Sequence, residues 1–319
     1  MKFLQSTAVA LCLAALATPC AAMSAEEINS ADPLAASGEG PQAGIVRLQV
    51  ALDRTGASTG WIDGHNGPST ERAIRAAEEM LGLPVDGQLD PELWTILQTG
   101  QPAMQTYTLT AEDVNQTLVP DFERGDWETM RGLNCICYHT LTEAFAEKFH
   151  MDEELLKALN PGVDFSVAGT NILVAAPGED KDTPVARVLV DKAEGQVRGF
   201  DEGGKLVWAA RAAVGSESTP SPSGTVEVTA VALDPTYTYN PENFPENNIK
   251  DTFNVAAGPN GPVGSVWIDL SKPTYGLHGT PHPEELNTMA SHGCVRMTNW
   301  DAKELAHLVT AGVPVEFVE

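Results

Sequence analysis

A polar segment, residues 178–184, separates two parts of the chain whose apolar residues follow different spacings. Before it, the stretches 44–56 and 141–162 carry apolar residues at helical spacing and end at glycine or proline, which predicts helices. After it, residues 186–215 alternate apolar and polar positions between Gly-containing turns, which predicts a β-meander. The two patterns predict a multidomain α+β chain, in which 178–184 is a linker and 185–319 is a mostly-β domain.

The first 22 residues have the order of a secretory signal peptide. Lys2 precedes an apolar run that is too short to span a bilayer, and small residues follow it. We expect cleavage after Ala22 or Ala25 and export of a soluble mature chain. Residues 23–40 are rich in Ala, Ser, Gly and acidic side chains, so we expect them to form a flexible leader.

The charge of the chain limits the classes of partner that it can bind. There are 19 Lys and Arg residues against 44 Asp and Glu residues, which gives a formal net charge of −25. Nucleic acids and anionic lipids are bound through Lys and Arg, which neutralise phosphate groups. We therefore expect no nucleic-acid partner and no anionic membrane surface as a partner.

Two short segments, 278–280 (HGT) and 291–297 (SHGCVRM), carry the residues with the clearest chemistry. A cysteine becomes a nucleophile at neutral pH when a nearby base accepts its proton, so Cys294 and His278 are the candidate nucleophile and base. Gly293 permits a sharp turn that can aim consecutive N–H groups at one point. The backbone N–H groups of Gly293 and Cys294 are therefore candidate oxyanion donors, and His292 is a further candidate.

Other residues of these segments are expected to contact a substrate. Arg296 lies two residues beyond Cys294 and points the same way if the segment is extended, so its guanidinium can bind a substrate carboxylate or brace the site. Residues 234–263 are rich in Pro, Asn and Gly and are too long for a plain connection, which indicates a lid or cleft wall. The expected substrate contacts are Arg296, Ser291, Thr280 and Tyr239.

Two interpretations compete with a cysteine nucleophile. In the first, Cys294 is a buried structural residue beside chance histidines. In the second, zinc is bound by a thiolate and imidazoles, since these ligands suit that metal; Pro281 and Pro283 argue against the helix that would present two of the histidines. The ligands would be His278, His282, His292 and Cys294. We expect no metal and no other cofactor.

The remaining cysteines bear on the same question. Removal of the signal peptide would leave Cys135, Cys137 and Cys294, and an odd number in an exported protein indicates one free thiol. Cys135 and Cys137 would lie on one face of a strand, where a bridge between them would be strained. We expect both to be reduced and partly buried, with a metal or redox role as the alternative.

The two segments together closely resemble the signature of L,D-transpeptidases, the YkuD-like cysteine enzymes of peptidoglycan. The resemblance extends over residues 186–317, and segments 214–228 and 234–241 resemble those of Gram-negative members. It implies a periplasmic enzyme in which Cys294, His278 and Gly279 take part in catalysis. The implied donor is a peptidoglycan tetrapeptide stem, cut before its terminal D-Ala through a thioester.

The same resemblance implies the acceptor and the inhibitors. The acceptor is the diamino acid of another stem, which gives a 3→3 cross-link, or the amino group of an outer-membrane protein or lipoprotein. Carbapenems are expected to acylate the catalytic cysteine. The alternatives are an L,D-carboxypeptidase or amidase that hydrolyses the same class of bond, and a wall-binding protein whose catalytic domain is inactive.

Two accessory regions precede the linker. Residues 41–100 resemble a small three-helix peptidoglycan-binding domain, through Leu48-Gln49, the turns at 62–64 and 86–87, and Trp94. Residues 104–177 have a β-α-α-β order that is similar to a LysM module, which binds glycan chains. An insertion of about thirty residues after its first strand departs from that compact module, and a structural brace is the alternative role.

Overall fold

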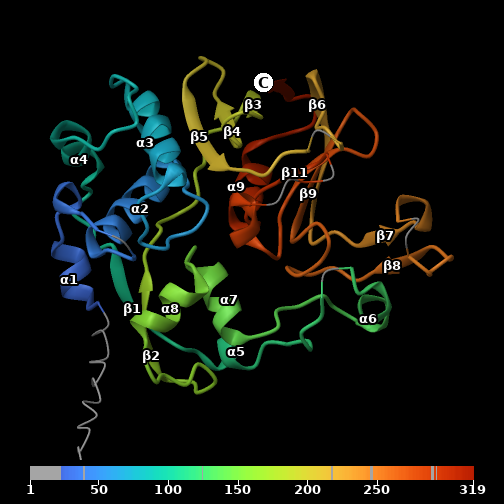
Figure 1. Ribbon diagram of the computed structural model, residues 1–319, viewed down its shortest axis with the longest axis horizontal. Coiled ribbons are helices and arrows are strands. Elements are labelled where there is room, and N and C mark those ends of the chain that lie inside the picture. The colour runs from blue at the N-terminus through green and yellow to red at the C-terminus, as the bar shows by residue number, and fades with distance from the viewer. Residues whose placement is uncertain are drawn as a thin grey trace, which may run out of the picture.

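The computed structural model describes residues 23–38, 40–123, 125–216, 218–244, 247–288, 291 and 293–319. The expected signal peptide and His292 lie outside the described residues. Figure 1 shows the N-terminal helices at one side of the molecule and the strands of the C-terminal sheet at the other, with α9 among these strands. No helix among the described residues is long and apolar enough to cross a membrane.

The N-terminal part is helical, as expected. Its helices are α1 (Ala25–Ser30), η1 (Pro33–Ala35), α2 (Ala43–Thr55), α3 (Pro68–Leu81) and α4 (Pro91–Leu97). Apolar residues of α2, α3 and α4 form one core, which includes Leu48, Ile74 and Trp94. The helices of residues 41–97 therefore pack together as one unit, which we call the helical domain.

The expectation of a flexible leader at 23–40 was wrong. Ser24 and Glu27 form a capping box that starts α1, and Ile28 is fully buried. Asn29 accepts the Met104 N–H and donates to the Met104 carbonyl, so α1 is attached to the next part of the chain. Composition alone indicated a linker, but one cap and one apolar side chain are enough to order this short helix.

The next part, residues 104–177, has the expected β-α-α-β order, and we call it the βααβ region. Strands β1 (Met104–Thr108) and β2 (Asn171–Ala175) pair antiparallel around α7 (Leu141–Lys148) and α8 (Glu153–Leu159). The insertion, residues 109–140, contains α5 (Ala111–Val114) and α6 (Trp127–Gly132). The fold agrees with the predicted order, and the relation to LysM modules stays a prediction.

The insertion carries a second correction. Cys135 and Cys137 are joined by a disulfide, with their Cα atoms 5.3 Å apart, and so are not reduced thiols. The segment is not a strand, and its bent backbone brings the two Cα atoms within the range that a disulfide spans. Among the described residues, Cys294 is the cysteine that is not part of a disulfide.

The C-terminal domain, residues 185–319, is mostly β, as expected. Its eight-stranded sheet has the order β11-β10-β9-β6-β12-β3-β4-β5. The strands are β3 (Arg187–Asp191), β4 (Gln196–Phe200), β5 (Leu206–Arg211), β6 (Gly224–Leu233), β9 (Val266–Leu270), β10 (Gly276–His278), β11 (Val295–Arg296) and β12 (Pro314–Val318). Helix α9 (Asn299–Leu308) covers the sheet through Ala302 and Leu305, both fully buried.

The expected cleft wall at 234–263 contains a short hairpin. It consists of β7 (Tyr237–Tyr239) and β8 (Phe253–Val255), with η2 (Pro241–Asn243) between them. Helix α6 of the insertion packs against this hairpin, and Figure 1 shows the two side by side, away from the rest of the βααβ region. The insertion therefore connects the βααβ region to the C-terminal domain.

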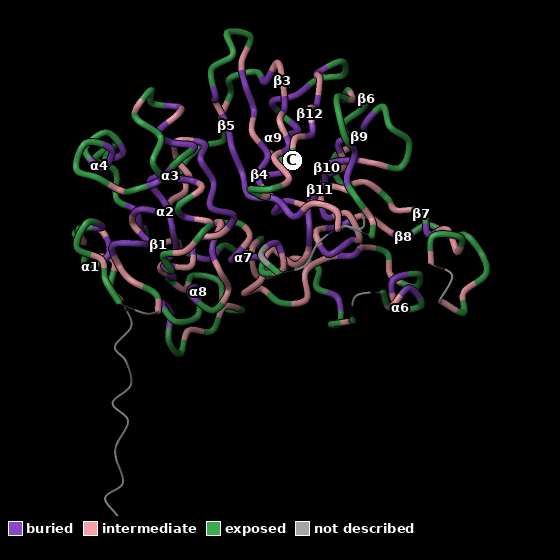
Figure 2. Tube along the Cα trace, turned by 45° about the horizontal axis from the view of Figure 1, so that its top comes forward, coloured by how far each residue is buried: buried purple, intermediate pink, exposed green. Residues whose placement is uncertain are grey.

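The accessory parts are docked on the C-terminal domain. The core of the helical domain includes Phe200, Leu206 and Ala209 from β4 and β5, and Figure 2 shows that buried segments continue from α2 across β5 to α9. Arg198 and Glu79 form an ion pair at the edge of the contact between the helical domain and the sheet. The residues 178–184 that we expected to act as a linker are also held, since the Lys181 N–H donates to Glu304.

Candidate active site

Pairing of two short strands brings the two motif segments together. Strand β10 pairs in parallel with β11, with Leu277 opposite Val295 and His278 opposite Arg296. His278 ends β10, and Cys294 immediately precedes β11. Continued by one residue, this register places Cys294 opposite Gly276, two residues before His278, so the candidate base and the candidate nucleophile lie on neighbouring strands. Residues two apart along a strand share a face of the sheet, so the two side chains are expected on the same face.

His278 is held as a neutral base. It is 5% exposed, its ring stacks on Trp267 with centroids 5.7 Å apart, and its Nδ1 lies 2.7 Å from the Gly279 carbonyl oxygen. A carbonyl can only accept, so Nδ1 carries the proton and Nε2 keeps its lone pair. Burial, together with the charge of Arg296, lowers the pKa of His278 to about 4, so the imidazole is neutral at neutral pH.

Cys294 is a neutral thiol at rest. Burial raises the pKa of Cys294, and a hydrogen bond from the Gly276 backbone opposes this rise. The thiol lies 3.6 Å from the Thr274 carbonyl oxygen, to which it can donate. With both groups neutral at rest, an imidazole base would take the thiol proton as the sulfur attacks, rather than before the substrate arrives.

Ser291 shapes the turn that carries the nucleophile. Its hydroxyl accepts from the Gly293 N–H at 3.0 Å and donates to the Cys294 carbonyl, and its own N–H donates to the Val214 carbonyl at 2.8 Å. Ser291 is only 5% exposed. Its expected role in substrate contact is therefore not supported, and its hydrogen bonds fit a role in orienting the turn.

The hydrogen bond from Gly293 to Ser291 also corrects an expected oxyanion donor. The Gly293 N–H is already engaged, so it does not face an incoming oxyanion. Gly293 has a φ of 110° and lies against the Tyr275 ring, so a side chain would be both strained and too large here. The Cys294 N–H remains a candidate donor, and His292 lies outside the described residues.

The two residues after His278 have different tasks. Gly279 supplies the carbonyl that fixes the His278 tautomer, and a Cβ at this position would collide with the Asn299 side chain. Thr280 is 3% exposed, and its hydroxyl accepts from the His282 N–H at 3.2 Å. Gly279 thus belongs to the site, whereas the burial of Thr280 argues against the substrate contact that we expected.

Arg296 is braced within the protein. Its guanidinium lies 3.9 Å from the Glu285 carboxylate, and its backbone exchanges hydrogen bonds with Ala213. Its side chain is 12% exposed. Of the two roles that the sequence left open, the ion pair favours bracing the site.

The tyrosine expected to contact substrate is in the wrong place. Tyr239 is fully buried in an aromatic cluster, with its ring stacked on Phe244 and Phe253. Tyr237, in the same short strand, is partly exposed, and burial and the negative charge of a Cys294 thiolate raise its pKa. Tyr237 is therefore the hairpin tyrosine within electrostatic range of Cys294, and a search for partly buried strand tyrosines would have included it.

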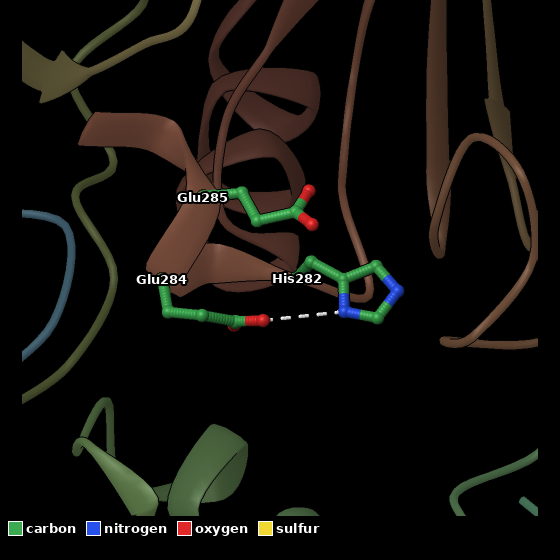
Figure 3. A group of neighbouring side chains, drawn as sticks. All are labelled: His282, Glu284 and Glu285. Carbon is green, nitrogen blue, oxygen red and sulfur yellow. Dashed lines mark hydrogen bonds and ion pairs between the residues drawn. The ribbon is translucent and has the colours of Figure 1, made fainter. Parts of the chain in front are cut away.

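The zinc interpretation is not supported. Among the described residues, one group of side chains could hold a metal ion: His282, Glu284 and Glu285, which Figure 3 draws. Their potential ligand atoms lie within 4.8 Å of one another. His282 Nδ1 lies 3.3 Å from the Glu284 carboxylate. This group, at the η3 turn (Pro283–Asn287), includes neither Cys294 nor His278, so the four-ligand set that we considered does not form among the residues described.

Known proteins resemble both the C-terminal domain and the helical domain. Residues 186–317 match the YkuD L,D-transpeptidase catalytic domain, and residues 41–97 match a putative peptidoglycan binding domain. A putative L,D-transpeptidase YkuD of Bacillus licheniformis is 29% identical over 174 residues, which make up 54% of this chain and 90% of that protein. The probable L,D-transpeptidase YbiS of Escherichia coli (strain K12) is 26% identical over 183 residues, or 56% of this chain and 60% of that protein.

Solved structures are more distant. L,D-transpeptidase 3 from Mycobacterium tuberculosis, solved in complex with a faropenem-derived adduct, is 16% identical and has a TM-score of 0.35. The match covers 46% of this chain and 66% of that one.

Proposed function

We propose, from the premise that residues 186–317 are an L,D-transpeptidase catalytic domain, that Cys294 is its nucleophile and acts on tetrapeptide stems of peptidoglycan. The observation that supports this proposal is the pairing of β10 with β11, whose register sets Cys294 on the strand beside His278, an imidazole whose Nε2 is unprotonated. No other cysteine among the described residues is free to form a thioester.

The chemistry follows from the two neutral groups. As the Cys294 sulfur attacks the peptide carbonyl, its proton passes to His278 Nε2 and a tetrahedral oxyanion forms, for which the Cys294 N–H is a candidate donor. Collapse of this intermediate breaks the peptide bond, and the imidazolium returns the proton to the departing D-Ala amine. The products of this half-reaction are free D-Ala and a thioester between the shortened stem and Cys294.

The second half-reaction needs an amine. The amino group of a diamino acid in another stem attacks the thioester, loses a proton to His278, and gives a 3→3 cross-link while the thiol is restored. An outer-membrane protein or lipoprotein can supply the amine in the same way. The peptidoglycan-binding domain at 41–97 supports a wall substrate, and the sequence of residues 1–22 supports the periplasm as its location.

The test is product analysis with purified tetrapeptide muropeptides. The mature protein should release D-Ala and form cross-linked dimers, whereas tripeptide without dimer would show that water is the acceptor and that the enzyme is a carboxypeptidase. Cys294→Ala and Cys294→Ser should abolish both reactions, because both pass through one thioester. The control is the double variant Cys135→Ser with Cys137→Ser, which should keep most activity. Turnover by Cys294→Ala would contradict the mechanism.

Acylation by a carbapenem gives a second test that needs no acceptor. We expect intact-mass measurement to show one adduct, mapped to the peptide that contains Cys294. The same exposure should leave Cys294→Ala unmodified. An adduct on any other residue would contradict the assignment of the nucleophile.

A further inference from the structure

A side chain of the βααβ region contacts the residue that supports the catalytic base. Asn299, the first residue of α9, is 1% exposed. Its Nδ2 donates to the Glu147 carboxylate at 2.8 Å and to the Pro259 carbonyl at 3.1 Å, and its Oδ1 accepts from the Ser265 N–H at 3.0 Å. Glu147 lies in α7, so this contact joins two parts of the chain that are 152 residues apart.

The Asn299 amide lies against the backbone that orients His278. A Cβ at Gly279 or at Gly264 would collide with Asn299 Oδ1, so both glycines are packed directly on this oxygen. Gly279 is the residue whose carbonyl accepts from His278 Nδ1. A change in the position of the Asn299 amide would therefore move the carbonyl that fixes the tautomer and orientation of the base.

Glu147 helps to select which way the Asn299 amide faces. An asparagine amide can be turned over with little change in shape, which exchanges its acceptor and donor ends. The carboxylate of Glu147 accepts from Nδ2, and this favours the orientation with Oδ1 toward Ser265 and Gly279. Glu147 is itself held, because the Tyr138 hydroxyl donates to its other oxygen at 2.7 Å.

We propose that Glu147 is a positioning residue for catalysis: through Asn299 it holds the Gly279 carbonyl, and so the tautomer and orientation of His278. The βααβ region then completes the catalytic site in addition to any role in wall binding. This proposal rests on the proposed function, since it needs His278 to act as the base toward Cys294.

The test uses two variants at one position and a control one helical turn away. Glu147→Ala removes the acceptor, whereas Glu147→Gln keeps a carbonyl oxygen for Asn299 Nδ2 and an amide that can donate to Tyr138. Glu143→Ala is the matched control, because Glu143 caps the start of α7 through the His139 and Thr140 N–H groups. Neither of these hydrogen bonds involves Asn299.

We expect Glu147→Ala to lower kcat for cross-linking by about 10- to 100-fold, the size typical of sub-ångström to ångström misplacement of a catalytic group, with KM changed by less than about threefold. Glu147→Gln should stay within about threefold of the native kcat, since the hydrogen-bond geometry is retained. Glu143→Ala should lose thermal stability without this loss of kcat. Rates of carbapenem acylation at Cys294 should follow the same order.

Three results would overturn the proposal: a native kcat in Glu147→Ala, a loss in Glu147→Gln as large as in Glu147→Ala, or an equal loss in Glu143→Ala. The last would assign the effect to the stability of α7. If Glu147→Ala does not fold, Tyr138→Phe replaces it as the test, because this variant removes the hydrogen bond to one oxygen of Glu147. Tyr138→Phe should lose less kcat than expected for Glu147→Ala. A native kcat in Tyr138→Phe would also overturn the proposal. Native protein that neither cross-links nor is acylated would instead overturn the proposed function.

Discussion

Among the contacts that join the accessory parts to the catalytic domain, two junctions differ in their chemistry. The aromatic junction lies between α6 of the insertion and the β7–β8 hairpin. Trp127 is its centre: its ring centroid is 4.9 Å from that of Tyr239, 4.8 Å from that of Phe244, and 5.7 Å from that of Tyr237. Such contacts are largely independent of pH and salt, because they bury apolar surface.

The polar junction joins the helical domain, the end of α7 and α9. His150 Nδ1 is 3.1 Å from the Asp53 carboxylate, and the His150 ring stacks on Trp300 with centroids 5.2 Å apart. Asp301 lies beside them and is 2% exposed. Buried titratable groups depend on protonation, so this junction responds to pH, whereas the aromatic junction holds the β7–β8 hairpin at any pH. The difference indicates that the hairpin and the docking of the domains can be perturbed separately.

Truncation of the aromatic centre should have the largest effect. We expect Trp127→Ala to cost about 3–5 kcal/mol of local packing energy, which loosens the hairpin. The KM for tetrapeptide stems should then rise about tenfold, or ~1.4 kcal/mol of binding, with a smaller change in kcat. Steady-state kinetics and thermal unfolding measure the two effects.

Trp94→Ala is the matched control. Trp94 and Trp127 are each 7% exposed, but Trp94 lies in the core of the helical domain. Trp94→Ala should lose comparable stability and keep the native KM. An equal rise in KM in both variants would mean that general loosening, rather than the hairpin, controls substrate binding.

The polar junction should make stability depend on pH. Burial, with the charge of Asp53, raises the pKa of Asp301 to about 8. A carboxyl with a raised pKa binds its proton more tightly in the folded state than in the unfolded state. The free energy of unfolding therefore decreases as the pH rises from the ordinary pKa of Asp toward the pKa of Asp301 in the folded protein. Between about pH 6 and pH 8 the loss is ~2 kcal/mol.

Asp301→Asn isolates that contribution. The variant cannot ionise at this position, so the midpoint of thermal unfolding should fall less between the two pH values than in the native protein. His150 acts in the same direction: burial alone would lower its pKa, but Asp53 and other carboxylates outweigh burial and raise it. Parallel pH profiles for the native protein and Asp301→Asn would contradict the assignment.

A surface ion pair should matter least at the aromatic junction. Arg131 lies 2.6 Å from Asp251, and their side chains are 41% and 60% exposed. Arg131→Gln should change the free energy of unfolding by less than ~1 kcal/mol and leave KM within twofold, since exposed pairs are screened by water and salt. A change in KM as large as that of Trp127→Ala would show that charge, not ring packing, holds the hairpin.

Salt should not weaken binding to the wall. The net charge of −25 repels the carboxylates of peptidoglycan stems, so added NaCl screens a repulsion over about 8 Å at physiological ionic strength. Pull-down of Cys294→Ala by purified sacculi should stay constant or rise with NaCl. The whole mature chain is used because the core of the helical domain includes residues of the catalytic sheet. A steep fall would reveal a local basic patch.

Several features could be predicted from the sequence because neighbouring residues decide them. The stretch 44–56 became α2, Ala43–Thr55, and the β-meander expected over 186–215 became β3, β4 and β5. Cys294 and His278 were proposed as a reacting pair because a thiol and an imidazole in Gly-containing segments indicate one chemistry. The pairing of β10 with β11 sets them on neighbouring strands, and their roles stay a prediction. The predicted resemblance to L,D-transpeptidases over 186–317 was confirmed.

The sequence could not reveal contacts between distant segments. Hydrophobic spacing indicates that a face is buried, but it does not identify the partner of a buried polar group. The contact of Glu147 with Asn299, the engagement of Gly293 by Ser291 and the burial of Tyr239 each depend on tertiary packing. The sequence by itself thus determined the local elements and which side chains are candidates for the chemistry. Only the tertiary structure decided which donors remain for a substrate, because each buried polar group must find its partner within the fold.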